Sequence, residues 1–139
     1  MDKKEELMQT IKKMMQYLGF GDAESTIYAL LALSNEPLTI MEIAGKINYS
    51  IARIYSSISY LMKEGLVEKN RENGTTKYTA NINFIDVFES RRQEIMEKFL
   101  LPIISMQDHD ERVRRIVEYS KQVYNYFEKL NEMKKKTLV

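Results

Sequence analysis

The two side chains that most often serve as metal ligands or activated nucleophiles, histidine and cysteine, are nearly absent from this sequence. His109 is the single histidine, and it lies between Asp108 and Asp110. A metal site would need more ligands converging on it, and the flanking acids also suit the start of a helix. The chain has no cysteine, which excludes disulfides, Cys-ligated zinc and thiol nucleophiles. With no nucleophile–base pair and no phosphate-cradling glycine loop, the sequence predicts neither an enzyme, nor a metal site, nor a cofactor.

Basic side chains offer a different chemistry, the neutralisation of phosphate. The 139 residues carry 21 Lys and Arg against 20 Asp and Glu, so the whole chain shows no basic excess. Residues 1–43 contain four Lys against seven acidic residues, a net charge of −3, whereas residues 44–80 contain six basic against three acidic residues, a net charge of +3. Lys and Arg supply most of the non-specific affinity of a protein for DNA. We therefore expect residues 44–80 to contact DNA.

Apolar spacing and capping residues predict the helices that must position these cations. Steps of three and four between apolar residues indicate two amphipathic helices at the start of the chain, and Asp22 is expected to be the N-cap of the second. Thr39 and Glu42 fit the capping-box pattern of a short helix. Ser50 can cap the next one. The predicted helices cover 2–18, 22–33, 40–46 and 51–64.

A β-hairpin is expected directly after these helices. Asn73-Gly74 is a strong hairpin signal because both residues tolerate positive φ, and short β-compatible runs cover 66–70 and 75–79. The fold class is therefore mainly α with a small β-hairpin, in the order of a winged helix-turn-helix. Residues 50–64 would be the recognition helix in the major groove, and the hairpin would be a wing on the flanking DNA.

Side chains on the open faces of these elements are the candidates for DNA contact. A buried stripe of Ile51, Ile54, Ile58 and Leu61 leaves the other residues of the recognition helix facing outward or sideways. Tyr49 has two interpretations, a phosphate contact or a structural role. Arg53 is the leading candidate for a base or phosphate contact, and the alternative is a solvated surface residue. The expected DNA-binding residues are Lys46, Tyr49, Ser50, Ala52, Arg53, Ser56, Ser57, Tyr60, Arg71, Asn73 and Lys77.

The sequence predicts two parts: a DNA-binding domain of residues 1–82 and a helical dimerisation extension of residues 83–139. Pro102 is expected to kink or break the first of its helices, because proline removes an amide and clashes with the preceding turn. The last helix carries apolar residues close to a heptad seam, interrupted by Ser120, and such a seam needs a partner. The expected dimerisation residues are Leu7, Ile11, Met14, Ile95, Phe99, Val113, Ile116, Val123, Phe127 and Leu130.

One set of residues within positions 18–80 matches a known pattern. They are Leu18-Gly19-Phe20, Glu24, Ile27-Tyr28, Leu30-Leu31, Leu38-Thr39, Glu42-Ile43-Ala44, Arg53-Ile54-Tyr55, Leu61, Gly65-Leu66-Val67 and Lys77-Tyr78. With these residues the chain resembles the archaeal TrmB-type regulators and, more loosely, the MarR-like winged-helix proteins. The resemblance implies a dimeric, operator-binding transcription factor. It suggests that Tyr55 packs in support of the recognition helix, and the alternative is a free hydroxyl that reaches phosphate. Asn48 and Ser50 depart from it, since such proteins often have Gly and Pro there.

The leading hypothesis is a homodimeric, sequence-specific regulator that binds double-stranded DNA. The alternative is a winged-helix protein–protein interaction module in a larger complex, since fold alone does not fix function. We expect no sugar sensor, because 139 residues leave no room for a large sensor domain, and a small-molecule or protein effector stays open. The N-terminus lacks the apolar centre of a signal peptide and no apolar run approaches roughly 20 residues, so the expected location is the cytoplasm, with no membrane partner.

Overall fold

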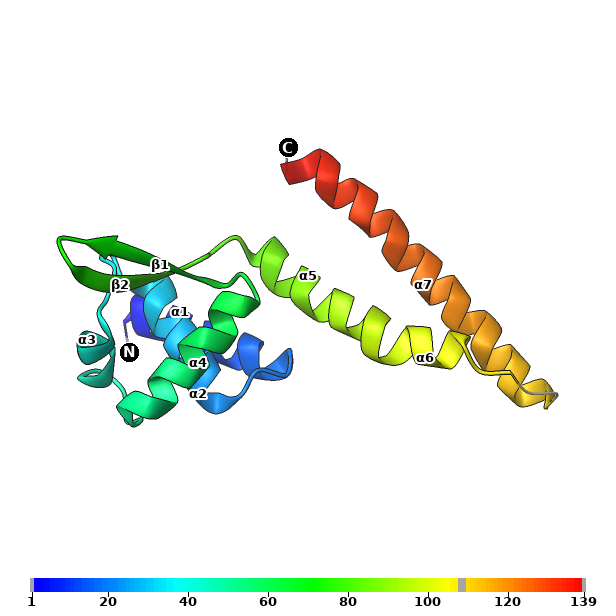
Figure 1. Ribbon diagram of the computed structural model, residues 1–139, viewed down its shortest axis with the longest axis horizontal. Coiled ribbons are helices and arrows are strands. Elements are labelled where there is room, and N and C mark those ends of the chain that lie inside the picture. The colour runs from blue at the N-terminus through cyan, green and yellow to red at the C-terminus, as the bar shows by residue number, and fades with distance from the viewer. Residues whose placement is uncertain (1, 108–109, 139) are drawn as a thin grey trace. The chain divides into compact units, whose positions relative to one another are not determined.

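The computed structural model describes residues 2–107 and 110–138. The chain divides into two compact units, Met1–Phe88 and Glu89–Val139 (Figure 1). The sequence led us to expect a boundary between residues 82 and 83. The observed units meet later, because the first turns of α5 belong to the first unit, where Val87 is fully buried in the core.

Four helices build most of the first unit. α1 (Lys3–Tyr17) begins at Asp2, whose carboxylate accepts the Glu5 amide at 2.8 Å. α2 is Asp22–Leu33, α3 is Ile40–Ala44 and α4 is Ile51–Lys63. These bounds agree with the predicted helices, except that α3 ends two residues before the predicted Lys46.

Two of the three predicted N-caps are confirmed. Thr39 and Glu42 form the complete capping box of α3, with hydrogen bonds of 3.0 and 3.1 Å. The Ser50 hydroxyl accepts the Arg53 amide at 3.1 Å at the start of α4. The third N-cap was wrong: Gly21 occupies that position of α2, and Asp22 is its first helical residue. The Asp22 carboxylate instead binds side chains of other elements.

The predicted hairpin is present as β1 (Val67–Glu72) and β2 (Thr75–Ala80). Its turn is Asn73-Gly74, with φ of 51° and 80°, and Glu72 pairs directly with Thr75 across it. Positive φ at both central residues defines the turn whose twist matches that of the strands. A single bridge, with N···O distances of 2.8 and 3.0 Å, joins Tyr78 to Leu38 ahead of α3. The wing is thereby fixed to the segment that leads into the helix-turn-helix.

The core of the first unit lies between the helices and the hairpin, and its fully buried side chains include Met15, Ile27, Ile43, Ile58 and Leu66. Two sequence expectations are corrected here. Ile11, expected in a dimer interface, is only 6% exposed in this core, because α1 packs along α2. Ile51, expected on the buried stripe of α4, is 42% exposed, because it lies at the first helical position, beyond the edge of the core.

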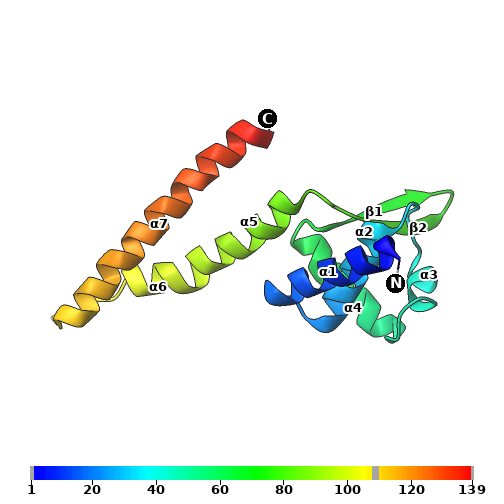
Figure 2. The same ribbon diagram turned by 180° about the vertical axis from the view of Figure 1, so that it is seen from behind.

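The second unit is an antiparallel helical hairpin. Its first arm comprises the end of α5 (Phe84–Ile95), a π-helical turn η1 (Met96–Leu100) and α6 (Leu101–Ile104). Its second arm is α7 (Glu111–Leu138), and both views show α6 beside the N-terminal part of α7 (Figures 1 and 2). None of the helices formed by the described residues is long and apolar enough to cross a membrane.

Pro102 does not break the first arm where the sequence predicted. The backbone remains helical on both sides of it, and the arm ends at Ile104. The wider π-helical turn lies directly before the proline, where the Leu101 amide reaches back to the Met96 carbonyl. A π-helical turn changes the local hydrogen-bond register, and we infer that this accommodates the missing amide and the ring of Pro102. The disturbance is therefore a change of helical register.

Arg92 ties the two arms of the second unit together. Its side chain is 7% exposed, and one Nη donates to the Phe127 carbonyl at 2.7 Å. The other Nη contacts the side chains of Glu89 and Asn131. A buried guanidinium is tolerated only when its charge and donors are satisfied, and these partners satisfy it.

Candidate nucleic-acid interface

The open face of α4 is the surface that the first unit could offer to a DNA groove. Ala52, Tyr55, Ser56 and Ser59 are exposed at steps of three and one, whereas Ile54 and Ile58 hold the opposite face in the core. This face carries the Ala52 methyl group, the Tyr55 phenol ring and two serine hydroxyls, of which that of Ser56 donates to the Arg53 carbonyl at 3.0 Å. Such groups contact thymine methyls and base-edge donors or acceptors without carrying charge.

Arg53 lies at the edge of this face and is held by α2. Its Nη2 lies 3.2 Å from Oε2 of Glu24, and its side chain is 49% exposed. The same Glu24 oxygen accepts the Ser57 hydroxyl at 2.8 Å. Ser57 itself is 1% exposed, so its expected place on the DNA-facing surface was wrong. The reason is that Ser57 faces α2, where its hydroxyl anchors Glu24.

Tyr49 has the structural role that the sequence left open. Its hydroxyl donates to the Asp22 carboxylate, which also lies 3.3 Å from Lys12 Nζ and accepts from Gln16 at 2.9 Å. The Tyr49 hydrogen bond is the largest cause that lowers the pKa of Asp22, and the same bond raises the pKa of Tyr49. The loop before α4 is thus fastened to the start of α2.

The cations of the wing lie on both faces of the hairpin. Arg71 pairs with Thr76 and therefore shares a face with Lys69 and Tyr78, whereas Lys77 pairs with Asn70 on the other face. Burial is the largest cause that raises the pKa of Tyr78, and the remaining cause is its proximity to Tyr55 of α4. Tyr78, on the face that also carries Lys69 and Arg71, therefore lies within electrostatic reach of Tyr55 on α4.

Lys77 and Lys46 form a separate basic pair near α3. Hydrogen bonds from Thr39 are the main causes that lower the pKa of Glu42, and the positive charges of Lys77 and Lys46 lower it further. Both lysines are thus within electrostatic reach of one carboxylate. This arrangement places part of their charge beside an acidic side chain.

The structure leaves most predicted DNA contacts accessible. Tyr60 is 36% exposed, although its ring lies edge-on to Phe20 with centroids 6.2 Å apart. Lys77 is half-buried and Ser57 is buried. Exposed side chains among the predicted contacts are Lys46, Ser50, Ala52, Arg53, Ser56, Arg71 and Asn73.

Two residues of this surface are not among the predicted DNA contacts. Tyr55 was expected to pack, yet it is 52% exposed, and Ile51 was assigned to the core. The spacing of apolar residues assigned Ile51 to the buried face of the helix and did not decide the orientation of Tyr55. The signal that could have found them is their place in the first turns of a recognition helix, where such residues meet base edges.

The predicted dimerisation residues divide into two sets. Val113 and Phe127 are half-buried within the second unit, as is Leu130, and Met14 packs against the first core beside the buried Ile11. The others lie on the surface: Leu7, Ile95, Phe99, Ile116 and Val123 are between 41% and 57% exposed.

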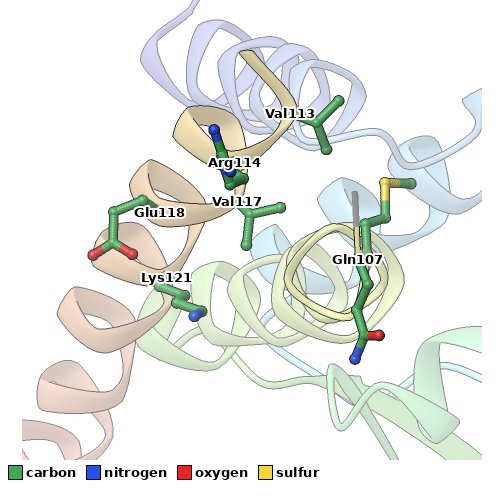
Figure 3. A pocket seen from close by; sticks show the side chains of 7 residues that line it. Gln107, Val113, Arg114, Val117, Glu118 and Lys121 are labelled. Carbon is green, nitrogen blue, oxygen red and sulfur yellow. The ribbon is translucent and has the colours of Figure 1, made fainter. Parts of the chain in front are cut away.

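An open groove of about 570 Å³ lies beside the start of α7. Val113 and Val117 form its apolar floor, and Arg114, Glu118 and Lys121 line one side (Figure 3). Gln107 extends from the opposite side, ahead of Asp108 and His109, which lie outside the described residues. The described part of the chain brings together no group of three or more metal-ligating side chains.

Comparison with known proteins finds a family similar to most of the first unit. Residues 15–81 match the model of a family described as sugar-specific transcriptional regulator TrmB. This segment of the chain is similar to the TrmB family. This match runs from the end of α1 through β2, and so includes α4 and the hairpin. Comparison with curated proteins gives no match.

A solved structure extends the likeness beyond this TrmB segment. A chain described as the crystal structure of a transcriptional regulator aligns with a TM-score of 0.67 at 14% sequence identity, over 97% of this chain and 99% of its own length. At that identity the likeness shows the fold alone. The TrmB match points to a transcriptional regulator and not to an enzyme.

Proposed function

We propose that this chain is a homodimeric regulator that reads a specific duplex sequence. In this proposal α4 lies in the major groove and the β1–β2 wing contacts the flanking backbone. The observation that carries it is the open face of α4, with Ala52, Tyr55 and Ser56 exposed, together with the exposed cations Lys69 and Arg71 on one face of the hairpin. A helix fits the major groove, and phosphate contacts fix its register while base contacts specify sequence.

The uneven charge of the first unit supports the same orientation. Arg53 of α4 and Lys69 and Arg71 of β1 are exposed, whereas Asp22 and Glu42 are engaged by Lys12 and by the α3 capping box. In this orientation DNA would meet the exposed cations of α4 and of the wing. Lys69 and Arg71 are suited to phosphates, and the uncharged α4 face is suited to base edges.

Homodimerisation is supported by apolar surface on the second unit. Ile116, Tyr119, Val123 and Tyr126 of α7 are between 41% and 61% exposed at steps of three and four. Ile95 and Phe99 add exposed apolar area on the other arm. A second copy that covers these residues would bring two α4 helices into one symmetric dimer, for which a palindromic site is expected.

Selection from a random pool of duplex DNA by the full chain tests this function. We expect an enriched palindrome whose half-site centres are separated by roughly 10 base pairs or a multiple of that spacing. The logarithm of the affinity should fall linearly with the logarithm of salt concentration, because phosphate contacts release counterions. If no sequence is enriched and no salt-dependent binding occurs, the protein-interaction module becomes the better account.

Measuring the affinity for the selected operator also allows a search for an effector. The groove lined by Arg114 and Lys121 combines cationic and apolar side chains, so it is the place in the second unit where we would look first. A small molecule that changes operator affinity in the wild type, but not after substitution of both cations, would identify it.

A further inference from the structure

We propose that Glu24 is a positioning residue that orients Arg53 for a directional contact with a base edge. This inference rests on the proposed function and concerns how the α4 surface obtains its specificity. Glu24 lies on α2 and is not itself part of the open face of α4.

The contacts of Glu24 form a short chain from the core to the surface. Its Oε2 accepts the hydroxyl of the buried Ser57 at 2.8 Å and contacts Nη2 of Arg53 at 3.2 Å. The Glu24 side chain is 15% exposed and that of Arg53 is 49% exposed. The carboxylate is therefore anchored from inside the unit, and it holds a guanidinium that reaches solvent.

The backbone of α2 is shaped to leave room for this carboxylate. Gly21 is the N-cap of α2, and a Cβ atom there would lie 2.9 Å from Oε1 of Glu24. The carboxylate also lies in the first turn of α2, where the helix dipole favours negative charge. Two features unrelated to Arg53 thus fix the position of the carboxylate.

A fixed guanidinium is suited to reading a base. Arginine is long and flexible, and it loses side-chain conformational entropy when it binds a ligand. An arginine that is already held in place before binding loses less of this entropy. Its planar fork keeps further N–H donors for the paired acceptors of a guanine edge. A carboxylate that only competed with phosphate for Arg53 would have a different effect, because it would weaken binding to every sequence alike.

The test uses the full chain with Glu24→Gln, which keeps the acceptor for Ser57 and removes the charge. Affinities are measured for the selected site, for its single-base-pair variants and for random DNA. We expect Arg53→Ala to abolish preference at one base pair of each half-site, and Glu24→Gln to weaken preference at that same pair by about tenfold. Since Glu24 acts through Arg53, the double variant should match Arg53→Ala alone.

Two further variants separate positioning from charge and from folding. Glu36→Gln removes an equivalent charge at an exposed site after α2 and should leave every base preference unchanged. Gly21→Ala retains all charges and an ordinary φ, near −67°, but displaces the carboxylate, so it should reproduce the loss of preference in part.

Several results would overturn the inference. An equal rise in affinity for all DNA in Glu24→Gln would make Glu24 a source of repulsion alone. If the wild type selects a site and Glu24→Gln keeps its base preferences, this inference fails and the proposed function stands. If the wild type selects no sequence, both fail together.

Discussion

Tyr28 is a buried polar side chain on which the first unit depends. It is fully buried, and its hydroxyl donates to the Asn81 carbonyl at 2.7 Å. Asn81 also contacts Gly65, Asp86 and the Asn83 amide, so it joins the end of α4 to the start of α5. Burial raises the pKa of Tyr28 to about 12. The folded state therefore favours the neutral, protonated form of the Tyr28 hydroxyl.

The pKa of Tyr28 predicts how stability changes in alkali. Above about pH 10 the unfolded chain releases this proton while the folded chain keeps it until about pH 12, so the free energy of unfolding should fall across that range. Tyr28→Phe should cost about 1 kcal/mol at pH 8, because the Asn81 carbonyl loses its donor. The difference between the variant and the wild type should then shrink as the pH rises, as measured by urea unfolding.

Tyr17→Phe is the matched control, because Tyr17 is 92% exposed. It should match the wild type at every pH. A difference between Tyr28→Phe and the wild type that stays constant from pH 8 to alkali would contradict the raised pKa.

At the scale of elements, the wing depends on a turn that only certain residues can form. Asn73 and Gly74 both have positive φ, and a Cβ atom at Gly74 would meet nothing within 4 Å. Any effect of a substitution at Gly74 is therefore conformational and not steric. The other strand contacts, including the bridge from Leu38 to Tyr78, lie further from the turn.

Gly74→Ala should destabilise the first unit by about 1 kcal/mol, the cost of placing a Cβ atom in the left-handed region. Thermal unfolding should show a lower midpoint, and amide exchange should accelerate in β1 and β2.

Gly45→Ala provides the control for this turn. Gly45 has φ of −72°, and its Cβ atom would make ordinary contacts of 3.6 Å with backbone oxygens. That variant should be neutral or more stable by about 0.5 kcal/mol. Equal losses in the two variants would show that the turn conformation is not the cause.

For the whole molecule, α7 carries apolar side chains on two adjacent stripes. Val113, Val117 and Phe127 face the first arm of the hairpin, while Ile116 and Val123 remain on the surface. Exposed apolar rows at heptad spacing are typical of helices that pack against a second chain. One stripe folds the unit, and we expect the other to assemble the dimer.

Light scattering at micromolar concentration should give twice the mass of the chain. The double variant Ile116→Lys with Val123→Lys should give the monomer mass, because each lysine would bury an unpaired charge in the interface. The affinity of the double variant for a palindromic site should also fall, because a monomer contacts only one half-site.

Asn125→Lys adds the same charge on the polar side of α7, where Asn125 is exposed, and should leave the dimer intact. A monomeric wild type, or a double variant that remains dimeric, would refute this interface.

The sequence alone determined the features that depend on neighbouring residues. The capping box of Thr39 and Glu42, the N-cap at Ser50 and the Asn73-Gly74 turn are satisfied within a few positions of the chain. Their order predicted the helix-turn-helix with its hairpin, and the family match agrees with it.

The tertiary structure decided what each side chain faces. Ser57 and Arg53 are close in sequence, yet one is buried and both contact Glu24, which lies about thirty positions earlier on α2. Ile11 is in the core because α2 covers it. The apolar seam of α7 is only partly buried, because the first arm of the hairpin covers one side of it. Periodicity identifies an apolar face, but the element that packs against it sets how much remains exposed.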